Sequence, residues 1–224
     1  MLTAQLTGQV RSHLTELNNN ILIHSDVVRE FLALQKAAKS AGFNVQIASG
    51  FRSFERQLLI WNNKYAGKTP VLDKNEQRLD LTALSEQEKL LAILHWSALP
   101  GASRHHWGTD FDIFDPDLLP AKQNLQLTVS EYNNGGYFQD LTHWLTENMQ
   151  QFGFYRPYQT FSGGVAVEPW HISYYPIAGN ALQQLELSLI YELISKNNIL
   201  GRSLICRQLP MIYEKFIRNI NSIN

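Results

Sequence analysis

The stretch Ser103-Arg-His-His-Trp-Gly-Thr-Asp-Phe-Asp112 decides the fold, together with the later segment Glu168-Pro-Trp-His171. The two segments supply imidazoles and a carboxylate, which are groups that bind zinc, and one further carboxylate. Three protein ligands with a fourth position open to water are typical of a catalytic zinc site, whereas structural sites use four protein ligands. The further carboxylate supplies what such a site still needs, a base for the attacking water.

The spacing of the first segment requires a turn. On an unbroken helix His105 and Asp112 would lie about 10 Å apart along the axis, too far to share one ion. The chain must therefore fold back between them, and Gly108 can take the backbone angles that such a turn needs. Residues 109–114 then alternate polar and apolar side chains, which predicts a half-buried strand with Asp110 and Asp112 on its polar face.

The second segment is expected to bend, because Pro169 makes a continuous helix through Glu168 unfavourable. Such a bend brings Glu168 and His171 to one pocket. Glu-x-x-His is a weak signal by itself, and its pairing with Ser-x-His-x6-Asp makes it much stronger. Of the other imidazoles, His106 is interpreted as structural because it is adjacent to His105 and points elsewhere, and the rest as surface or packing residues: His13, His24, His95 and His143. Asp110 is an equally good candidate for a hydrogen-bond acceptor behind the ligands.

These residues resemble the zinc motifs of the VanY-type D-Ala-D-Ala carboxypeptidases, members of the LAS metallopeptidases (lysostaphin, D-Ala-D-Ala carboxypeptidases and Sonic hedgehog). The family pattern is Ser-x-His-x-x-Gly-x-x-x-Asp followed by Glu-x-Trp-His, and this chain matches it at every position. A third segment, Ser49-Gly-Phe-Arg-Ser53 with the later Gln57, resembles the family's Ser-Gly-Tyr-Arg-Ser segment. The resemblance covers roughly residues 26–178.

The resemblance implies a role for each matching residue. It assigns the zinc ligands as His105, Asp112 and His171. It implies that Glu168 takes a proton from the attacking water and passes it to the leaving amine, and that Arg52 stabilises the developing oxyanion. It also implies that Gln57 and Ser103 help to hold the terminal residue of the substrate, although Gln57 could equally be solvated and Ser103 a turn residue.

Composition fits one compact enzyme. The chain has 224 residues, 44% of them hydrophobic and 17% charged, which is enough for a full core without disulfides, and its single cysteine excludes an internal disulfide framework. The net charge of −1 gives no indication of a nucleic-acid partner. No window reaches the roughly 20 apolar residues of a membrane span, and residues 1–11 do not read as a secretory signal, so we expect a cytoplasmic protein. A processed precursor or a phage-style release route leaves a periplasmic or released protein as the alternative.

The coarse pattern predicts an α+β fold, in which a small antiparallel sheet with flanking helices surrounds the zinc site and C-terminal helices follow. Helices are expected at residues 26–41, 53–65, 85–95 and 138–152, and strands at 44–48, 109–114 and 165–167. Residues 1–178 are predicted to form the catalytic domain. Residues 179–197 and 202–221 are predicted to form two amphipathic helices in an extension, 179–224, that packs on the same domain. Because the extension could instead mediate dimerisation, both a monomer and a homodimer stay open.

The expected function is a zinc carboxypeptidase that removes a terminal D-amino acid, D-Ala, from peptidoglycan stem peptides or muropeptides. A cytoplasmic location favours L,D-carboxypeptidase action on recycled tetrapeptides. The motifs also allow a D-Ala-D-Ala carboxypeptidase, a peptidoglycan endopeptidase, a carboxypeptidase for other peptides, or a binding protein that retains zinc without turnover. The presence of both Glu168 and Arg52 argues against the last.

Overall fold

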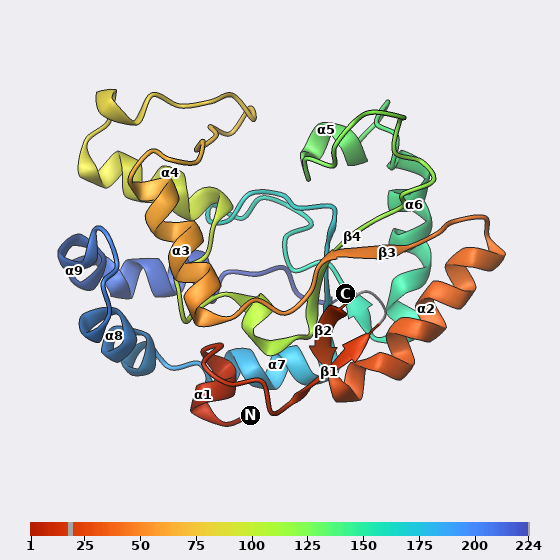
Figure 1. Ribbon diagram of the computed structural model, residues 1–224, viewed down its shortest axis with the longest axis horizontal. Helices are drawn as coiled ribbons and strands as arrows, with labels where there is room; N and C mark the ends of the chain where they lie inside the picture. The colour runs from red at the N-terminus through yellow and green to blue at the C-terminus, as the bar shows by residue number, and fades with distance from the viewer. Residues whose placement is uncertain (18–19, 224) are drawn as a thin grey trace.

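The computed structural model describes residues 1–17 and 20–223 and has the predicted α+β character (Figure 1). Four antiparallel strands form the main sheet in the order β3-β4-β6-β5, and β1 and β2 form a separate hairpin. The strands are β1 (Leu14–Leu17), β2 (Ile21–His24), β3 (Gln46–Ser49), β4 (Asp110–Phe114), β5 (Phe154–Tyr155) and β6 (His171–Tyr174). The helices are α1 (Thr3–Leu6), α2 (Val28–Ser40), α3 (Phe54–Tyr65), α4 (Glu86–Trp96), α5 (Val129–Tyr132), α6 (Gln139–Asn148), α7 (Tyr175–Gln184), α8 (Leu187–Lys196) and α9 (Arg202–Ile212).

The main sheet has one apolar face, because side chains alternate across a strand. Phe111 and Ile113 of β4 and Ile172 of β6 are fully buried on this face and pack against α2 and α6. The opposite face carries Asp110, Asp112 and His171. The sheet therefore separates an apolar core on one side from a row of polar side chains on the other.

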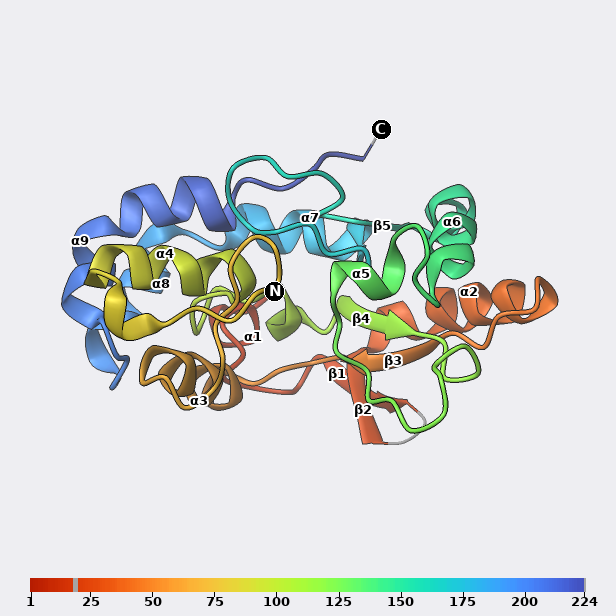
Figure 2. The ribbon, with the colours of Figure 1, turned by 90° about the horizontal axis from the view of Figure 1, so that it is seen from above.

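A second apolar cluster lies on the other side of the molecule. Side chains of α3, α4, α8 and α9 share it, and among its members are Trp61, Leu90, Ile190 and Leu209. Figures 1 and 2 show these four helices together at one end of the molecule, while α2 and α6 lie beside the sheet at the other. The polar face of the sheet thus lies between two cores, each stabilised by burial of apolar surface.

Most predicted elements are confirmed. The helices expected at 26–41, 53–65 and 85–95 are α2, α3 and α4, and the one at 138–152 is α6 extended by a 3-10 turn, Met149–Phe152. Ser85 caps the start of α4, since its hydroxyl accepts a hydrogen bond from the amide of Glu88 and the Glu88 carboxylate accepts from Ser85. The expected strands at 44–48 and 109–114 are β3 and β4, shifted by one or two residues.

Three expectations need correction. Residues 165–167 form no strand; the Ala166 amide instead donates to the carbonyl of His95, so this segment is tied to the end of α4. The single helix expected at 179–197 is two, α7 and α8, because Glu186 is extended and the Leu185 carbonyl accepts from the Tyr213 hydroxyl at 2.8 Å. The helix expected at 202–221 is regular only to Ile212 and continues as a short π-helix to Ile217.

The predicted boundary after residue 178 lies inside α7. The side chains of α8 and α9 belong to the same apolar cluster as those of α3 and α4. The division into a catalytic domain and an extension stays a prediction. None of the helices in the described ranges 1–17 and 20–223 has the length and apolarity that crossing a bilayer would need.

Sequence reasoning assigned no element before residue 26, yet the hairpin of β1 and β2 covers the turn at Gly108. Gly108 has a φ of 68°, and its carbonyl accepts from the amide of His24 at 2.7 Å. A Cβ at this position would lie 2.5 Å from Leu14 Cδ2 and 2.8 Å from the His24 nitrogen. Both the backbone angle and the close approach therefore require glycine.

We expect Gly108→Ala to lower the free energy of unfolding by about 3 kcal/mol or more, because left-handed strain and overpacking add. Gly42→Ala is the matched control, since Gly42 also has a positive φ of 93° but a methyl group there would meet nothing within 4 Å. The control should lose only about 1–2 kcal/mol. Denaturant titration measures both values, and equal losses would contradict the steric argument.

Candidate active site

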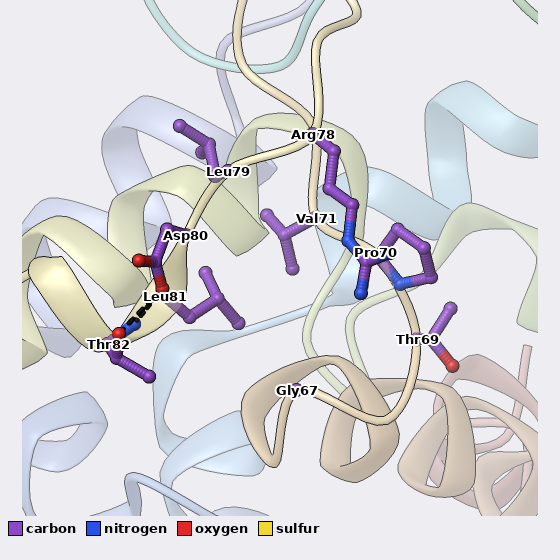
Figure 3. Close-up of a pocket in the computed structure, with 9 residues that line it drawn as sticks. All are labelled: Gly67, Thr69, Pro70, Val71, Arg78, Leu79, Asp80, Leu81 and Thr82. Atoms are coloured by element: carbon purple, nitrogen blue, oxygen red, sulfur yellow. Dashed lines mark hydrogen bonds between the residues drawn. The ribbon is translucent and has the colours of Figure 1, made fainter.

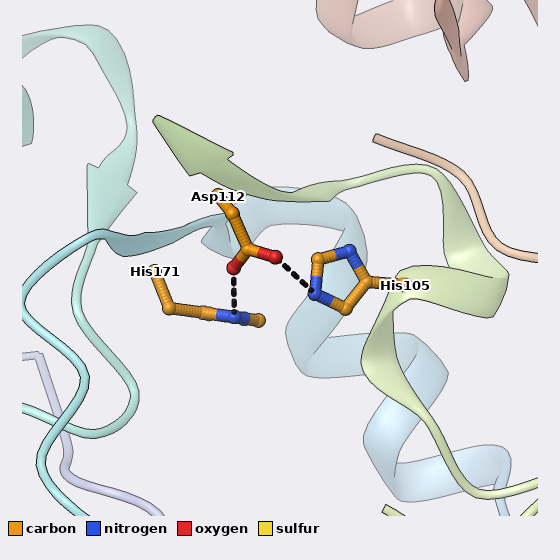
Figure 4. A group of neighbouring side chains, drawn as sticks. All are labelled: His105, Asp112 and His171. Atoms are coloured by element: carbon orange, nitrogen blue, oxygen red, sulfur yellow. Dashed lines mark hydrogen bonds and ion pairs between the residues drawn. The ribbon is translucent and has the colours of Figure 1, made fainter. Parts of the chain in front are cut away.

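The register of the main sheet brings two of the predicted ligands together. Asp112 of β4 and His171 of β6 are directly opposite each other in the antiparallel ladder. Both side chains project from the polar face, and His171 Nδ1 lies 3.2 Å from Asp112 Oδ1 (Figure 4). Residues 59 positions apart in the chain are thus held in contact by backbone pairing.

His105 reaches the same place from the turn before β4. A 3-10 helix, Arg104–Trp107, ends at the left-handed Gly108, which reverses the chain into the strand. The predicted fold-back between His105 and Asp112 is therefore confirmed, and His105 Nε2 lies 3.4 Å from Asp112 Oδ2. The other ring nitrogen, Nδ1, is 2.9 Å from the carbonyl of Gly50, which requires a proton on Nδ1 and leaves Nε2 free to accept.

These three residues fit a zinc ion. Their ligand atoms all lie within 4.8 Å of one another, and the two distances to Asp112 are 3.2 and 3.4 Å. Tetrahedral coordination at bond lengths of about 2.0–2.1 Å places neighbouring ligand atoms about 3.3 Å apart. All three side chains are buried, and the set of two imidazoles and one carboxylate leaves a fourth position open, as catalytic zinc sites do.

Asp110 orients the ring of His171. From the sequence, Asp110 has an even chance of being a hydrogen-bond acceptor behind the ligands. His171 Nε2 lies 3.0 Å from Asp110 Oδ1, so a proton on Nε2 directs Nδ1 toward Asp112. Arg104 Nε donates to the same oxygen at 2.7 Å, and Thr109 Oγ1 donates to Oδ2 at 2.7 Å. Asp110, held by Arg104 and Thr109, therefore supports the predicted ligand His171.

Sequence reasoning missed Arg104, although it lies inside the first motif. Its guanidinium also donates to Ser173 Oγ at 2.7 Å and lies over the ring of Trp107. Burial opposes the charged form of Asp110, but Arg104 and the bond from His171 outweigh that effect and hold the pKa of Asp110 well below its usual value. Asp110 is therefore ionised, which makes it a strong acceptor for His171. The position of Arg104 next to the predicted ligand His105 was the signal in the sequence that could have identified it.

Glu168 borders the cluster without belonging to it. Its Oε2 lies 3.5 Å from His171 Nδ1, and its side chain is 14% exposed. The amide of Glu168 donates to the carbonyl of Tyr158 at 3.0 Å, and the amide of His171 donates back to the Glu168 carbonyl at 3.1 Å. The expected bend at Pro169 is therefore present. Burial raises the pKa of Glu168 to about 7, partly opposed by the charge of His171, so this carboxyl group can both take up and release a proton near neutral pH.

Arg52 lies in the short connection between the end of β3 at Ser49 and the start of α3 at Phe54, as expected from the sequence. The helix begins immediately after it, because the Ser53 hydroxyl accepts from the amide of Arg56. Arg52 NH2 donates to Ser49 Oγ at 3.1 Å and is 3.8 Å from Asp112 Oδ2. The guanidinium therefore faces the predicted metal position from the side of β3.

His106 holds the backbone of Arg52, which agrees with its expected structural role. Its Nδ1 lies 2.6 Å from the carbonyl of Arg52, and its Nε2 accepts from the amide of Gly101 at 3.0 Å. Burial lowers the pKa of His106 to about 3, so the ring is neutral and can serve as donor and acceptor at once.

Gln57 and Ser103 are both buried beside these groups. Gln57 is fully buried, which contradicts the alternative of a solvated side chain. Its Oε1 accepts from Arg52 NH1 at 3.0 Å, and its Nε2 donates to the carbonyl of Ala98 at 2.7 Å. In this structure Gln57 therefore steadies Arg52, and the roles of Gln57 and Ser103 in holding a substrate stay predictions.

A separate hollow lies in the loop between α3 and α4, lined by residues from Gly67 to Thr82 (Figure 3). The carboxylate of Asp80 in this hollow accepts from the amide and hydroxyl of Thr82 and so caps a short 3-10 helix. None of the seven predicted site residues lines this hollow, so it contributes nothing to the cluster.

The chain is similar in sequence and in structure to known proteins. The sequence profile of the VanY family, described as D-alanyl-D-alanine carboxypeptidase, matches residues 20–177. The chain belongs to the VanY carboxypeptidase family. A relative from Haemophilus influenzae, described as an uncharacterized protein, is 45% identical over 121 residues, which are 53% of this chain and 92% of that protein.

Two solved VanY structures are similar to this member of the family. The vancomycin resistance D,D-pentapeptidase VanY, as a point mutant in complex with Zn(II), is 28% identical with a TM-score of 0.52, over 77% of this chain and 83% of that one. VanYB in complex with D-Alanine-D-Alanine is 26% identical with a TM-score of 0.53, over 85% and 92% of the two chains. The fold class inferred from the motifs is thereby confirmed.

The geometry of this VanY-family protein predicts a zinc site at His105, Asp112 and His171. His171→Ala should lose most of the bound metal, measured as zinc per chain after dialysis. Asp110→Asn keeps the shape but removes the charged acceptor behind His171, so we expect the dissociation constant for zinc to rise by about 10- to 100-fold in a chelator competition. Thr109→Val is the matched control, because it removes a hydrogen bond to Asp110 without touching His171. Unchanged affinity in Asp110→Asn would contradict the orienting role.

Proposed function

We propose that this protein is a zinc-dependent carboxypeptidase that releases a terminal D-amino acid, D-Ala, from peptidoglycan stem peptides. The observation that carries the proposal is the buried cluster of His105, Asp112 and His171 with Glu168 beside it and Arg52 facing it. Membership of the VanY carboxypeptidase family supports the same reaction. The Zn(II) complex of a similar VanY protein supports zinc as the metal.

The residues of the site have different roles in the proposed hydrolysis. Zinc, when bound by His105, Asp112 and His171, supplies Lewis-acid activation of water and of the scissile carbonyl. Glu168 accepts a proton from the attacking water and later donates it to the nitrogen of the leaving D-Ala, a double role open to a largely buried carboxyl group beside the metal ligands. Arg52 donates hydrogen bonds to the oxygen of the scissile carbonyl as negative charge develops on it.

The preferred substrate within this class is a second part of the proposal. We favour L,D-carboxypeptidase action, in which a recycled tetrapeptide stem loses its D-Ala and becomes a tripeptide. This preference depends on a cytoplasmic location, which stays a prediction. D,D-carboxypeptidase action is the main alternative, and the complex of a similar protein with D-Alanine-D-Alanine favours it. The expected partners are therefore stem peptides or muropeptides, and the oligomeric state stays open between monomer and homodimer.

Glu168→Gln tests the base. The amide keeps the size of the side chain but cannot accept the proton, so we expect kcat to fall by about 100-fold or more while zinc stays bound. Turnover on a stem peptide and zinc per chain are measured on the same sample, which makes the metal content an internal control. A variant with full zinc and near-normal kcat would show that another group is the base.

A panel of purified muropeptides tests the substrate. Incubation with tetrapeptide and pentapeptide stems, followed by mass spectrometry, should yield tripeptide from the tetrapeptide, with little cleavage of the same peptide ending in L-Ala. Loss of D-Ala from the pentapeptide alone would assign D,D-carboxypeptidase activity instead. Cleavage inside either stem would identify an endopeptidase, and no cleavage by the zinc-loaded protein would leave only a binding function.

A further inference from the structure

The first nine residues of the chain precede the region, 20–177, that the VanY family profile matches. They form α1 and a turn at Gly8, and residues 6–8 are buried. The Leu6 carbonyl at the end of α1 accepts a hydrogen bond from Nε1 of Trp107 at 3.0 Å. Trp107 is fully buried in the 3-10 helix that also carries a predicted zinc ligand. A segment outside the three sequence motifs is therefore bonded to one of them.

Gly8 is the point at which this segment meets the connection between β3 and α3. Its carbonyl accepts from the amide of Phe54, the first residue of α3, at 2.9 Å. The ring of His106 lies against it, because a Cβ at Gly8 would be 2.3 Å from His106 Nδ1 and 2.7 Å from Cγ. Gly8 also has a φ of 75°. Both the backbone angle and the contact with the ring therefore require glycine.

The two groups that Gly8 contacts hold the backbone around Arg52. His106 Nδ1 is 2.6 Å from the Arg52 carbonyl, and Phe54 is two residues further along the same connection. The Arg52 amide in turn donates to the carbonyl of His105 at 3.1 Å. The backbone around Arg52 is therefore fixed at three places, and two of them involve groups that Gly8 contacts.

The guanidinium of Arg52 is the group that needs this support. It donates to Ser49 Oγ at 3.1 Å and to Gln57 Oε1 at 3.0 Å. A donor stabilises developing charge only within hydrogen-bonding distance of the oxygen, and a misplacement of about 1 Å can lower the rate by about 100-fold. The zinc ligands have separate supports, the carbonyl of Gly50 and the side chain of Asp110. A shift of the Arg52 backbone should therefore lower the rate without releasing the metal.

We propose that Gly8 is a positioning residue of the active site: the segment 3–9 sets the ring of His106 and the start of α3, and through them places Arg52 for the reaction. This inference rests on the proposed hydrolytic function and extends the site beyond the region that the family profile matches. Because Gly8 acts through a donor that is needed in the transition state, it affects kcat and leaves KM and zinc binding unchanged.

The test is Gly8→Ala, made in the wild type and in Arg52→Lys. In the wild type we expect kcat on a stem peptide to fall by about 10- to 100-fold, because the added methyl group displaces the His106 ring and with it Arg52. KM and zinc per chain should stay the same. Arg52→Lys already lacks the guanidinium fork, so there Gly8→Ala should change kcat by less than about twofold, since residues that act through one group are not additive.

Gly67→Ala is the matched control. Gly67 has a similar φ of 70°, but a methyl group there would meet nothing within 4 Å, so the variant has the backbone strain of Gly8→Ala without the contact. Its kcat should equal that of the wild type. Thermal unfolding shows whether each variant is folded. If Gly8→Ala does not fold, His106→Phe replaces it in the same cycle, because phenylalanine keeps a ring and removes the donor to the Arg52 carbonyl.

The outcomes separate this inference from the function on which it rests. If the zinc-loaded wild type cleaves no stem peptide, the proposed function fails and this inference fails with it. If the wild type is active and Gly8→Ala keeps its kcat, the positioning role alone is wrong. An equal fall of kcat in Arg52→Lys would also overturn the role, because the effect would then not pass through Arg52. Loss of zinc from Gly8→Ala would overturn it as well, since the segment would then act on the metal ligands.

Discussion

The pairing of β4 with β6 is the constraint on which the rest of the site depends. It sets Asp112 opposite His171 and Asp110 opposite Ser173, so one imidazole lies between two carboxylates with a different ring nitrogen toward each. A shift of one residue in either strand would turn these side chains to the other face, where Phe111 and Ile172 are buried. The apolar face therefore enforces the geometry of the polar one. Burial of core side chains stabilises the register, and the register positions the ligands.

The charged and polar side chains around the cluster contact partners on two sides of it. Arg104 balances Asp110, and Asp110 in turn orients His171. On the opposite side Gly50 orients His105 through its carbonyl, and His106 holds the backbone of Arg52. Burying such groups costs free energy unless they are paired and hydrogen-bonded. The site is consequently rigid, since a change in one side chain leaves the next without its partner.

The chain determined by itself which residues form the centre and most of the helices. His105, Asp112, His171, Glu168 and Arg52 could be recognised because their residue types suit zinc and peptide hydrolysis and their spacing resembles the motifs of the VanY family. The turn at Gly108 and the strand after it follow from local rules, because seven residues cannot join two ligands of one ion without folding back. Helices such as α3 and α4 have caps and apolar spacing that depend only on neighbouring residues.

Only the tertiary structure decided how segments distant in sequence meet. The hairpin of β1 and β2 had no local signal, and it is stabilised where it covers Gly108 and extends beside Gly50. At the break between α7 and α8, the Leu185 carbonyl accepts a hydrogen bond from the Tyr213 hydroxyl, 28 residues later in the chain. The part played by Arg104 depends on Ser173, 69 residues later in the chain, which no spacing rule places beside it. Long-range packing and pairing supply these contacts, and local sequence patterns report only on residues within a few turns.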